Sequence, residues 1–329
     1  MIARRDVLGL GLACLGGPIG LRRATAQGGY PDRPIKLVIP FPPGGIGDAV
    51  GRPWADKMKS LLGQVVVENQ GGAGGVLGGA AVVHASPDGY TLLLGNLGTH
   101  VLLPAAGGSA PYDPAKDLDA ISIVVIAALA IVVHPSLSVP TLKDLGAYAE
   151  ANPGGLSYGS SGAGSASHLT GELFKSLTHA RGIISVPYKG GGQMINDVIS
   201  GHIQMGVVNV TGQILELHRA GKVRMLAVTT PARIIAAPDI PTAVEAGIPG
   251  MVAQNFIGLF APATTPEEII AQVSRATHDA MADEAFRQRL VASGFEPYPD
   301  SSPQAARQFV GGEIARWARL INAIGLKLE

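Results

Sequence analysis

The stretch LSYGSSGAGSASHLTGELFKSL, residues Leu156–Leu177, says more about the fold than any other part of the sequence. A short apolar run leads into a loop of glycine and serine. The chain then continues as a predicted helix, in which leucines recur every four residues and share one face. These leucines are Leu169, Leu173 and Leu177. The pattern predicts a strand, a glycine loop and a helix in direct succession.

The loop in this stretch has the properties of an anion site. Glycine permits φ values that turn several backbone N–H groups in one direction. Ser165 or Ser167 can cap the helix that follows. The helix dipole places a partial positive charge at the same point, so an anion needs no cationic side chain there. A tight strand-to-helix turn with a serine cap explains the same residues without a ligand.

A second unit of the same kind lies upstream. Residues Ile35–Phe41, IKLVIPF, read as a buried strand, and the loop PPGGIGD at 42–48 follows. The next stretch has helical spacing, with its inward face formed by Val50, Trp54, Met58 and Leu61. Two strand–loop–helix units in one chain predict two lobes that clamp a small anion between two helix N-termini.

Composition limits the function classes. The chain has 329 residues, enough for two domains, with 47% hydrophobic and 15% charged residues, as in a globular protein. The formal net charge is zero, which argues against a nucleic-acid partner. The sequence has no P-loop, no H-E-x-x-H and no G-x-S-x-G, and no G-x-G-x-x-G at a strand-to-helix turn. We therefore expect no cofactor and no metal site.

The N-terminus reads as a targeting segment. Arg4-Arg5 precede an apolar stretch at 7–19, and Ala24-Thr25-Ala26 is a small-x-small cleavage site. The two arginines resemble a twin-arginine signal, although a Sec signal also carries arginines. We expect residues 1–26 to be a signal peptide, cleaved near Ala26 on export to the periplasm. The one cysteine, Cys14, lies within this segment and is a poor match to a lipidation site.

Beyond the signal, apolar runs alternate with helical spacings, which predicts an α/β protein with mostly parallel sheets. Residues Ile121–His134 form a β-branched run long enough to pass from one lobe to the other. Pro53 falls inside the first helix, where it removes a backbone bond and should kink the helix. No stretch after the signal is a convincing transmembrane helix.

A few polar side chains stand where ligands bind in α/β folds, at strand ends and helix starts. His168 lies at the start of the helix after the Gly/Ser loop, although a lone histidine is more often a satisfied or surface residue. Asp48 either balances the helix dipole or holds a ligand ammonium or a water. Asn209 and Tyr188 end strands, and both are predicted to face the cleft; Tyr188 can equally be a cleft wall.

The chain resembles the Bug-type solute receptors, which are the extracytoplasmic binding proteins of tripartite tricarboxylate transporters. The matching segments cover residues 30–329 in order and include IKLVIPFPPGGIGD, VVENQGGAGG, PDGYTLL, GSSGAGSASHLTGELF, VPYKGGG, KVRMLAVT, GLFAPATTP and EIARWARLINAIGL. The resemblance implies a two-lobed, type II-like periplasmic-binding-protein fold with two crossover strands. Lobe 1 would comprise residues 30–127 and 252–329, and lobe 2 residues 128–251.

The resemblance also implies that the loops matching Pro43–Asp48 and Ser160–Ser165 hold a ligand carboxylate, partly through water. The expected ligand-binding residues are Gly44, Gly45, Ile46, Asp48, Thr99, Ser160, Gly162, Ala163, Gly164, Ser165, His168, Tyr188, Asn209 and Phe256. The chain departs from the family at Gln70-Gly71-Gly72, where Arg-Pro-Gly is usual, and at Phe256, where a larger aromatic is common. Ile46 is large for the first loop.

These observations predict a monomeric periplasmic receptor rather than an enzyme. Its ligand would be a di- or tricarboxylate, an acidic amino acid or an aromatic acid, delivered by transient contact to membrane transporter subunits. One alternative is an exported hydrolase with a serine nucleophile in the Gly/Ser loop, for which His168 is the only base nearby in sequence. Another is a receptor that feeds a sensor kinase.

Overall fold

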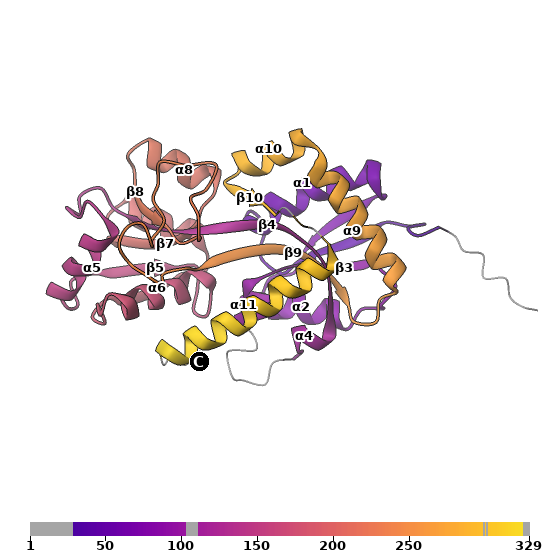
Figure 1. Cartoon of the computed structure of the whole chain (residues 1–329), viewed down its shortest axis with the longest axis horizontal. Coiled ribbons are helices and arrows are strands. Elements are labelled where there is room, and N and C mark those ends of the chain that lie inside the picture. The colour runs from indigo at the N-terminus through magenta and orange to yellow at the C-terminus, as the bar shows by residue number, and fades with distance from the viewer. Residues whose placement is uncertain (1–28, 103–110, 299, 301, 325–329) are drawn as a thin grey trace, which may run out of the picture.

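The computed structural model describes residues 29–102, 111–298, 300 and 302–324. These residues form two lobes of mixed α/β structure, joined side by side by two long strands that run between them (Figure 1). The predicted signal peptide lies outside the described residues. Within the described part of the chain, no helix has the length and apolar character needed to cross a membrane.

Strands and helices alternate along most of the chain, as the sequence predicts. The strands are β1 (Ile35–Ile39), β2 (Val65–Asn69), β3 (Thr91–Asn96), β4 (Leu118–Val133), β5 (Ser157–Ser160), β6 (Ile184–Pro187), β7 (Met205–Asn209), β8 (Arg224–Val228), β9 (Gln254–Pro262) and β10 (Phe295–Pro297). The helices are α1 (Ile46–Leu61), η1 (Ala73–Gly75), α2 (Val76–Val83), η2 (Gly98–Leu102), α4 (Pro114–Asp117), α5 (Leu142–Ala151), α6 (Ala166–Leu177), α7 (Gly191–Ile199), α8 (Gly212–Arg219), α9 (Glu267–Ala282), α10 (Glu284–Ala292) and α11 (Pro303–Ile324).

One sheet passes through both lobes, in the strand order β2-β1-β3-β9-β4-β7-β5-β6, with β8 and β10 also paired to β4. The first part of β4 pairs with β9 in lobe 1, and its last five residues, Leu129–Val133, pair with β7 and β8 in lobe 2. The prediction that the run at 121–134 crosses between the lobes is therefore confirmed. Nearly every residue of β4 is buried, because helices or neighbouring strands cover both of its faces.

The direction of the strands determines where the glycine loops lie. In lobe 1, β1 and β3 are parallel to each other, β9 is antiparallel to β3, and β4 is antiparallel to β9. Hence β1 and β4 run the same way, toward lobe 2. In lobe 2, β7 is antiparallel to β4 and β5 is parallel to β7, so β5 runs toward lobe 1. The loops that follow β1 and β5 therefore point at each other across the space between the lobes.

In lobe 1, a helix from early in the described chain packs against one from late in it. Helix α1 packs against α9, and Trp54 of α1 donates a hydrogen bond from Nε1 to Oγ1 of Thr277 at 3.2 Å. Val50, Trp54 and Met58 are fully buried, as predicted. Leu61 was predicted to face inward and is instead 38% exposed, because it is the last residue of α1. The helix runs unbroken through Pro53.

The stretch Leu156–Leu177 forms β5, the second glycine loop and α6 in lobe 2. Leu169 and Leu173 of α6 are buried in the core, whereas Leu177, on the same helical face, is 37% exposed at the end of the helix. Helix α11, in yellow in Figure 1, starts in lobe 1, crosses below the two long strands and contacts α6 of lobe 2. The division into 30–127 with 252–329 and 128–251 remains a prediction, and α11 touches both sides of it.

Candidate functional site

The first glycine loop joins β1 to α1 and is stabilised by one buried carboxylate. Gly44 adopts a left-handed conformation, with φ +88°, which favours glycine. Its N–H donates to a carboxylate oxygen of Asp48 at 2.9 Å. Gly45 occupies the N-cap position of α1 without a side-chain cap. Gly44 and Gly45 are exposed, and no described residue accepts a hydrogen bond from the N–H groups of Ile46 and Gly47.

Asp48 holds this loop in place. Besides Gly44, its carboxylate accepts a hydrogen bond from Nε of Arg52 at 2.7 Å and one from Nδ2 of Asn69 at 3.1 Å. The Asp48 residue is only 8% exposed. Asn69 also donates to the carbonyl of Phe41 at the start of the loop. Of the two roles that the sequence left open for Asp48, the structure supports the structural one, since three donors already occupy its oxygens.

The second glycine loop joins β5 to α6 and repeats the geometry of the first. Gly164 is left-handed, with φ +71°, and its N–H donates to Nδ1 of His168, four residues on, at 3.1 Å. Gly44 and Asp48 have the same spacing. Gly162 also has positive φ, +135°. Ser160, at the end of β5, is fully buried.

The hydroxyl groups of Ser165 and Ser167 hold the second loop together. Ser165 is the N-cap of α6: its Oγ accepts from the N–H of His168 at 3.2 Å and donates to the carbonyl of Gly162 at 2.7 Å. Ser167 Oγ accepts from the N–H of Ser161 at 2.9 Å and lies 3.0 Å from Oγ of Ser165. The prediction that a serine caps this helix is confirmed, and the residue is Ser165.

His168 is neutral and has one fixed tautomer. Burial lowers the pKa of His168 below its ordinary value of 6.5, and nearby Lys175 lowers it further, while Glu172 opposes both. Because Nδ1 accepts the hydrogen bond from Gly164, the ring proton lies on Nε2. His168 therefore fixes the left-handed glycine of the second loop and leaves an N–H donor on its other side.

The second loop also presents unpartnered backbone donors. No described residue accepts a hydrogen bond from the N–H groups of Gly162, Ala163, Ala166 and Ser167. Ala163 is exposed and Gly162 is partly exposed. Together with Ile46 and Gly47, these groups form two sets of free donors on facing helix N-termini, which is an environment suited to an anion.

Two further predicted residues, Tyr188 and Asn209, lie at strand ends in lobe 2, and Asn209 is the last residue of β7. Tyr188 follows β6, and its N–H donates to the carbonyl of Ser160 at 3.0 Å, so its backbone lies against the second loop. Its hydroxyl donates to the carboxylate of Asp197 at 2.7 Å. Burial, followed by the hydrogen bond and charge of Asp197, raises the pKa of Tyr188 to about 12. The ring is partly exposed and fits the cleft-wall role, because the hydroxyl is already engaged.

Thr99 and Phe256 lie behind the gap. Thr99 is fully buried, and its hydroxyl bonds the backbone N–H and carbonyl of Asn96, which forms the turn after β3. Phe256 is fully buried on β9, with its ring edge-on to Phe309 of α11 at a centroid distance of 5.4 Å. In this structure both side chains support the fold, and neither has an exposed surface for a ligand.

Sequence reasoning missed most of the residues that hold the loops, although it offered Ser167 as an alternative helix cap. Arg52 and Asn69 fix Asp48, Ser161 and Ser167 tie the second loop, and Asn255 contacts Asn209. The i,i+4 spacing of Asp48 and Arg52 was the one local signal available for the first loop. Ser161 and Ser167 meet within the loop itself, whereas strand pairing brings in Asn69 and Asn255.

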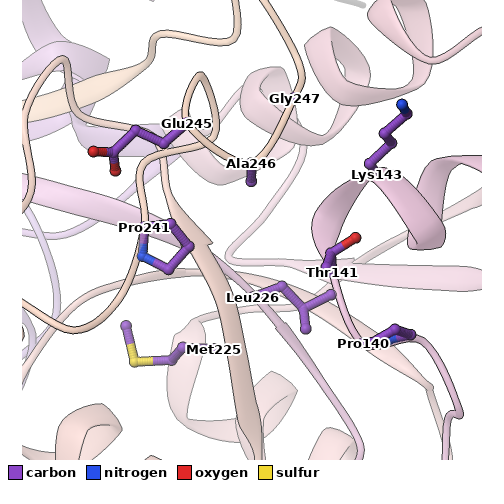
Figure 2. Close-up of a pocket in the computed structure, with 9 residues that line it drawn as sticks. All are labelled: Pro140, Thr141, Lys143, Met225, Leu226, Pro241, Glu245, Ala246 and Gly247. Carbon is purple, nitrogen blue, oxygen red and sulfur yellow. The ribbon is translucent and has the colours of Figure 1, made fainter.

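A separate hollow of about 560 Å³ lies on lobe 2, away from both loops. It is lined by the start of α5, by Met225 and Leu226 in the first half of β8, and by residues of the segment at 241–247. Figure 2 shows hydrocarbon from Leu226 and Pro241 between the polar ends of Lys143 and Glu245, which point away from each other. Glu245 is paired with Arg233, and the hollow contains none of the predicted ligand-binding residues. It therefore has no part in the site described above.

The protein has two α/β lobes joined by two long strands, and a glycine loop of each lobe faces the other. This arrangement is that of a two-lobed binding protein of the periplasmic type. The chain belongs to the tripartite tricarboxylate transporter family receptors, whose family model matches residues 50–326. It is 35% identical to Protein BugT of Bordetella pertussis (strain Tohama I), over 94% of this chain and 95% of that protein.

Solved structures share the fold at similar identity. The R. palustris protein Rpa4515 with adipate is 33% identical, with a TM-score of 0.84, over 90% of this chain and 99% of that one. MatC (Rpa3494) from Rhodopseudomonas palustris with bound malate is 31% identical, with a TM-score of 0.80, over 89% of this chain and 100% of that one. The predicted family and two-lobed fold are thereby confirmed.

Proposed function

We propose that this protein captures a small carboxylate between its lobes and passes it to a membrane transporter. The observation that carries the proposal is the pair of facing glycine loops, each with unpartnered N–H groups at a helix N-terminus. Adipate and malate, the ligands of two structural relatives, are both carboxylates. The expected site comprises these loops with His168, Tyr188 and Asn209.

The arrangement supports binding over hydrolysis. A serine nucleophile would need a histidine nitrogen that accepts its proton. Nδ1 of His168 instead accepts from the backbone of Gly164, and Oγ of Ser165 donates to the carbonyl of Gly162. Each group thus maintains the loop.

Neither loop offers an unpaired cationic side chain to the ligand, so binding relies on main-chain donors and stays reversible. Arg52 offsets Asp48 at the first loop, and the second loop contains no charged residue. Hydrogen bonds from main-chain donors to a carboxylate contribute roughly 1.5–3 kcal/mol each. A few such bonds, less the cost of ordering the ligand and closing the lobes, correspond to micromolar affinity, about −8 kcal/mol.

Proline substitution at the first helical position tests the proposal, because it removes one N–H and is otherwise tolerated there. Ile46 and Ala166 occupy this position in α1 and α6, and each follows an extended residue, as proline requires. Ile46→Pro and Ala166→Pro should each weaken carboxylate binding about tenfold or more, the effect of losing one bond to a charged group. Ile46→Ala and Ala166→Ser keep the N–H and are the matched controls.

Titration calorimetry against succinate, malate, glutarate, adipate, aspartate, glutamate and benzoate, with glucose and arginine as non-anionic comparisons, would measure these affinities. Binding of glucose or arginine in preference to every acid would overturn the proposal. Equal affinities in the proline variants and their controls would remove the loops from the site. Delivery to a transporter and export by residues 1–26 are part of the same proposal; uptake of the identified acid by cells with and without the gene tests delivery.

A further inference from the structure

Two asparagine side chains meet at the base of the gap between the lobes. Asn255, at the start of β9, donates from Nδ2 to Oδ1 of Asn209, the last residue of β7, at 3.2 Å. Oδ1 of Asn255 accepts from two backbone N–H groups, those of Leu97 at 3.3 Å and Phe256 at 3.0 Å. Asn255 is 4% exposed, whereas Asn209 is partly exposed.

The backbone dictates which way both amides point. A backbone N–H can only donate, so the atom of Asn255 that faces Leu97 and Phe256 must be the oxygen. Its NH₂ group then faces Asn209 and must meet an acceptor, which is Oδ1. The NH₂ group of Asn209 is consequently turned the other way, and no described residue accepts a hydrogen bond from it.

Strand register places this donor between the two glycine loops. Asn209 pairs with Leu129 of β4, and β7 is the neighbour of β5, the strand that leads into the second loop. Leu97 directly follows β3, which is the neighbour of β1, the strand that leads into the first loop. The asparagine pair therefore links the ends of both lobes at the level of their ligand loops.

We propose that Asn255 is a positioning residue that holds Asn209 as a hydrogen-bond donor, so that the site selects ligands with a second oxygen acceptor. Such ligands are dicarboxylates, whose first carboxylate the loops hold and whose distal carboxylate faces Asn209. This inference rests on the proposed function. A monocarboxylate of the same length forms no hydrogen bond with the Asn209 NH₂ and therefore binds more weakly than the dicarboxylate.

Matched acids test the selectivity directly. Succinate with butyrate, glutarate with valerate, and adipate with hexanoate differ only in the distal carboxylate. We expect wild-type protein to bind the dicarboxylate of its preferred pair at least tenfold more tightly than the monocarboxylate. The measured quantity is the ratio of the two Kd values from titration calorimetry.

Two variants separate positioning from general support of the fold. Asn255→Asp still accepts from Leu97 and Phe256 but cannot donate to Asn209, whose amide should then reverse and present its oxygen to the ligand. Asn209→Ala removes the donor. Both variants should bring the Kd ratio close to one, because they weaken the dicarboxylate selectively. Asn152→Asp, an exposed change at the end of α5, is the matched control and should leave the ratio unchanged.

The outcomes are distinct. A variant that weakens both acids of a pair equally would show a structural role only and would overturn the inference. So would a wild-type ratio near one, or a preference for benzoate or another monocarboxylate, although the proposed carboxylate-binding function would survive both. If the protein bound none of the matched acids and none of the acids of the calorimetry panel above, the proposed function itself would be wrong.

Discussion

The two glycine loops share one backbone geometry and differ in the chemistry that maintains it. In each, a left-handed glycine donates its N–H to a side chain four residues on, Asp48 for Gly44 and His168 for Gly164. In lobe 1 that acceptor is a buried anion, which needs Arg52 and Asn69 as partners. In lobe 2 it is a neutral imidazole.

The N-cap residues of α1 and α6 also differ in their chemistry. Ser165 caps α6 through its hydroxyl, whereas the N-cap residue of α1 is Gly45, which has no side chain. Lobe 1 thus holds its loop from within the helix, through Asp48, and lobe 2 holds its loop through hydroxyl groups around the cap. The comparison teaches that the shape of the donor loop can be maintained with or without charge, provided that the left-handed glycine has an acceptor.

The largest effect on stability should come from the first loop, which a charged side chain maintains. Asp48→Ala removes the carboxylate that accepts hydrogen bonds from Gly44, Arg52 and Asn69, and we expect a loss of about 3 kcal/mol in the free energy of unfolding, as for the loss of bonds to a charged group. Misplacement of the first loop should also weaken carboxylate binding more than tenfold. Urea unfolding and titration calorimetry measure the two effects.

Asp56→Ala is the matched control, since Asp56 lies on the same helix in a solvent-exposed pair with Lys59, and such pairs contribute little to stability. If Asp48→Ala unfolded and bound like Asp56→Ala, the role assigned to Asp48 would be wrong.

Acid should destabilise lobe 1 more than lobe 2. His100, in η2, is fully buried against Phe260, and burial lowers its pKa from 6.5 to about 3; His168 shifts in the same direction. A histidine with a lowered pKa binds fewer protons in the folded state, so its contribution to stability is complete above pH 6.5 and declines as pH falls toward the folded-state pKa. Between pH 6.5 and about pH 5, His100 should account for a loss of about 2 kcal/mol.

Urea unfolding at about pH 7.5 and about pH 5 measures this loss. His168→Asn, whose amide oxygen can still accept from Gly164, should leave most of it in place, whereas His100→Asn should remove most of it. The opposite ranking of the two variants would contradict the comparison.

The smallest effect should be that of the cap. Ser165→Ala removes the hydroxyl that accepts from His168 and should lower the free energy of unfolding by about 1 kcal/mol, while the protein stays folded and carboxylate binding weakens. Gly45→Ser is the reciprocal change, at an ordinary φ of −88° with no atom nearer than 3.9 Å to the new Cβ, and should stabilise α1 by a few tenths of a kcal/mol. Unchanged carboxylate affinity in Ser165→Ala would count against the second loop as a ligand site.

The loops themselves could be predicted from the sequence because their signals are local. A glycine that must adopt positive φ, a serine at an N-cap and an apolar run before them lie within about ten residues of each other, and backbone sterics alone connect them. Strand β4 could also be predicted from the sequence, because a run of sixteen mostly apolar residues, rich in β-branched side chains, is typical of a buried strand. Leu61 was misread because periodicity shows which face of a helix is apolar and does not show where the lobe ends.

The sequence by itself determined the two strand–loop–helix units and the family of the chain, and it predicted an anion site at the two loops. Only the tertiary structure decided which side chains serve the loops: Asn69 lies 21 residues from Asp48, and Asn209 lies 46 residues from Asn255. It also decided that Thr99 and Phe256 turn into the core. The physical reason is register: a strand side chain changes face with a shift of one residue, and pairing between distant strands, which no local pattern records, sets that shift.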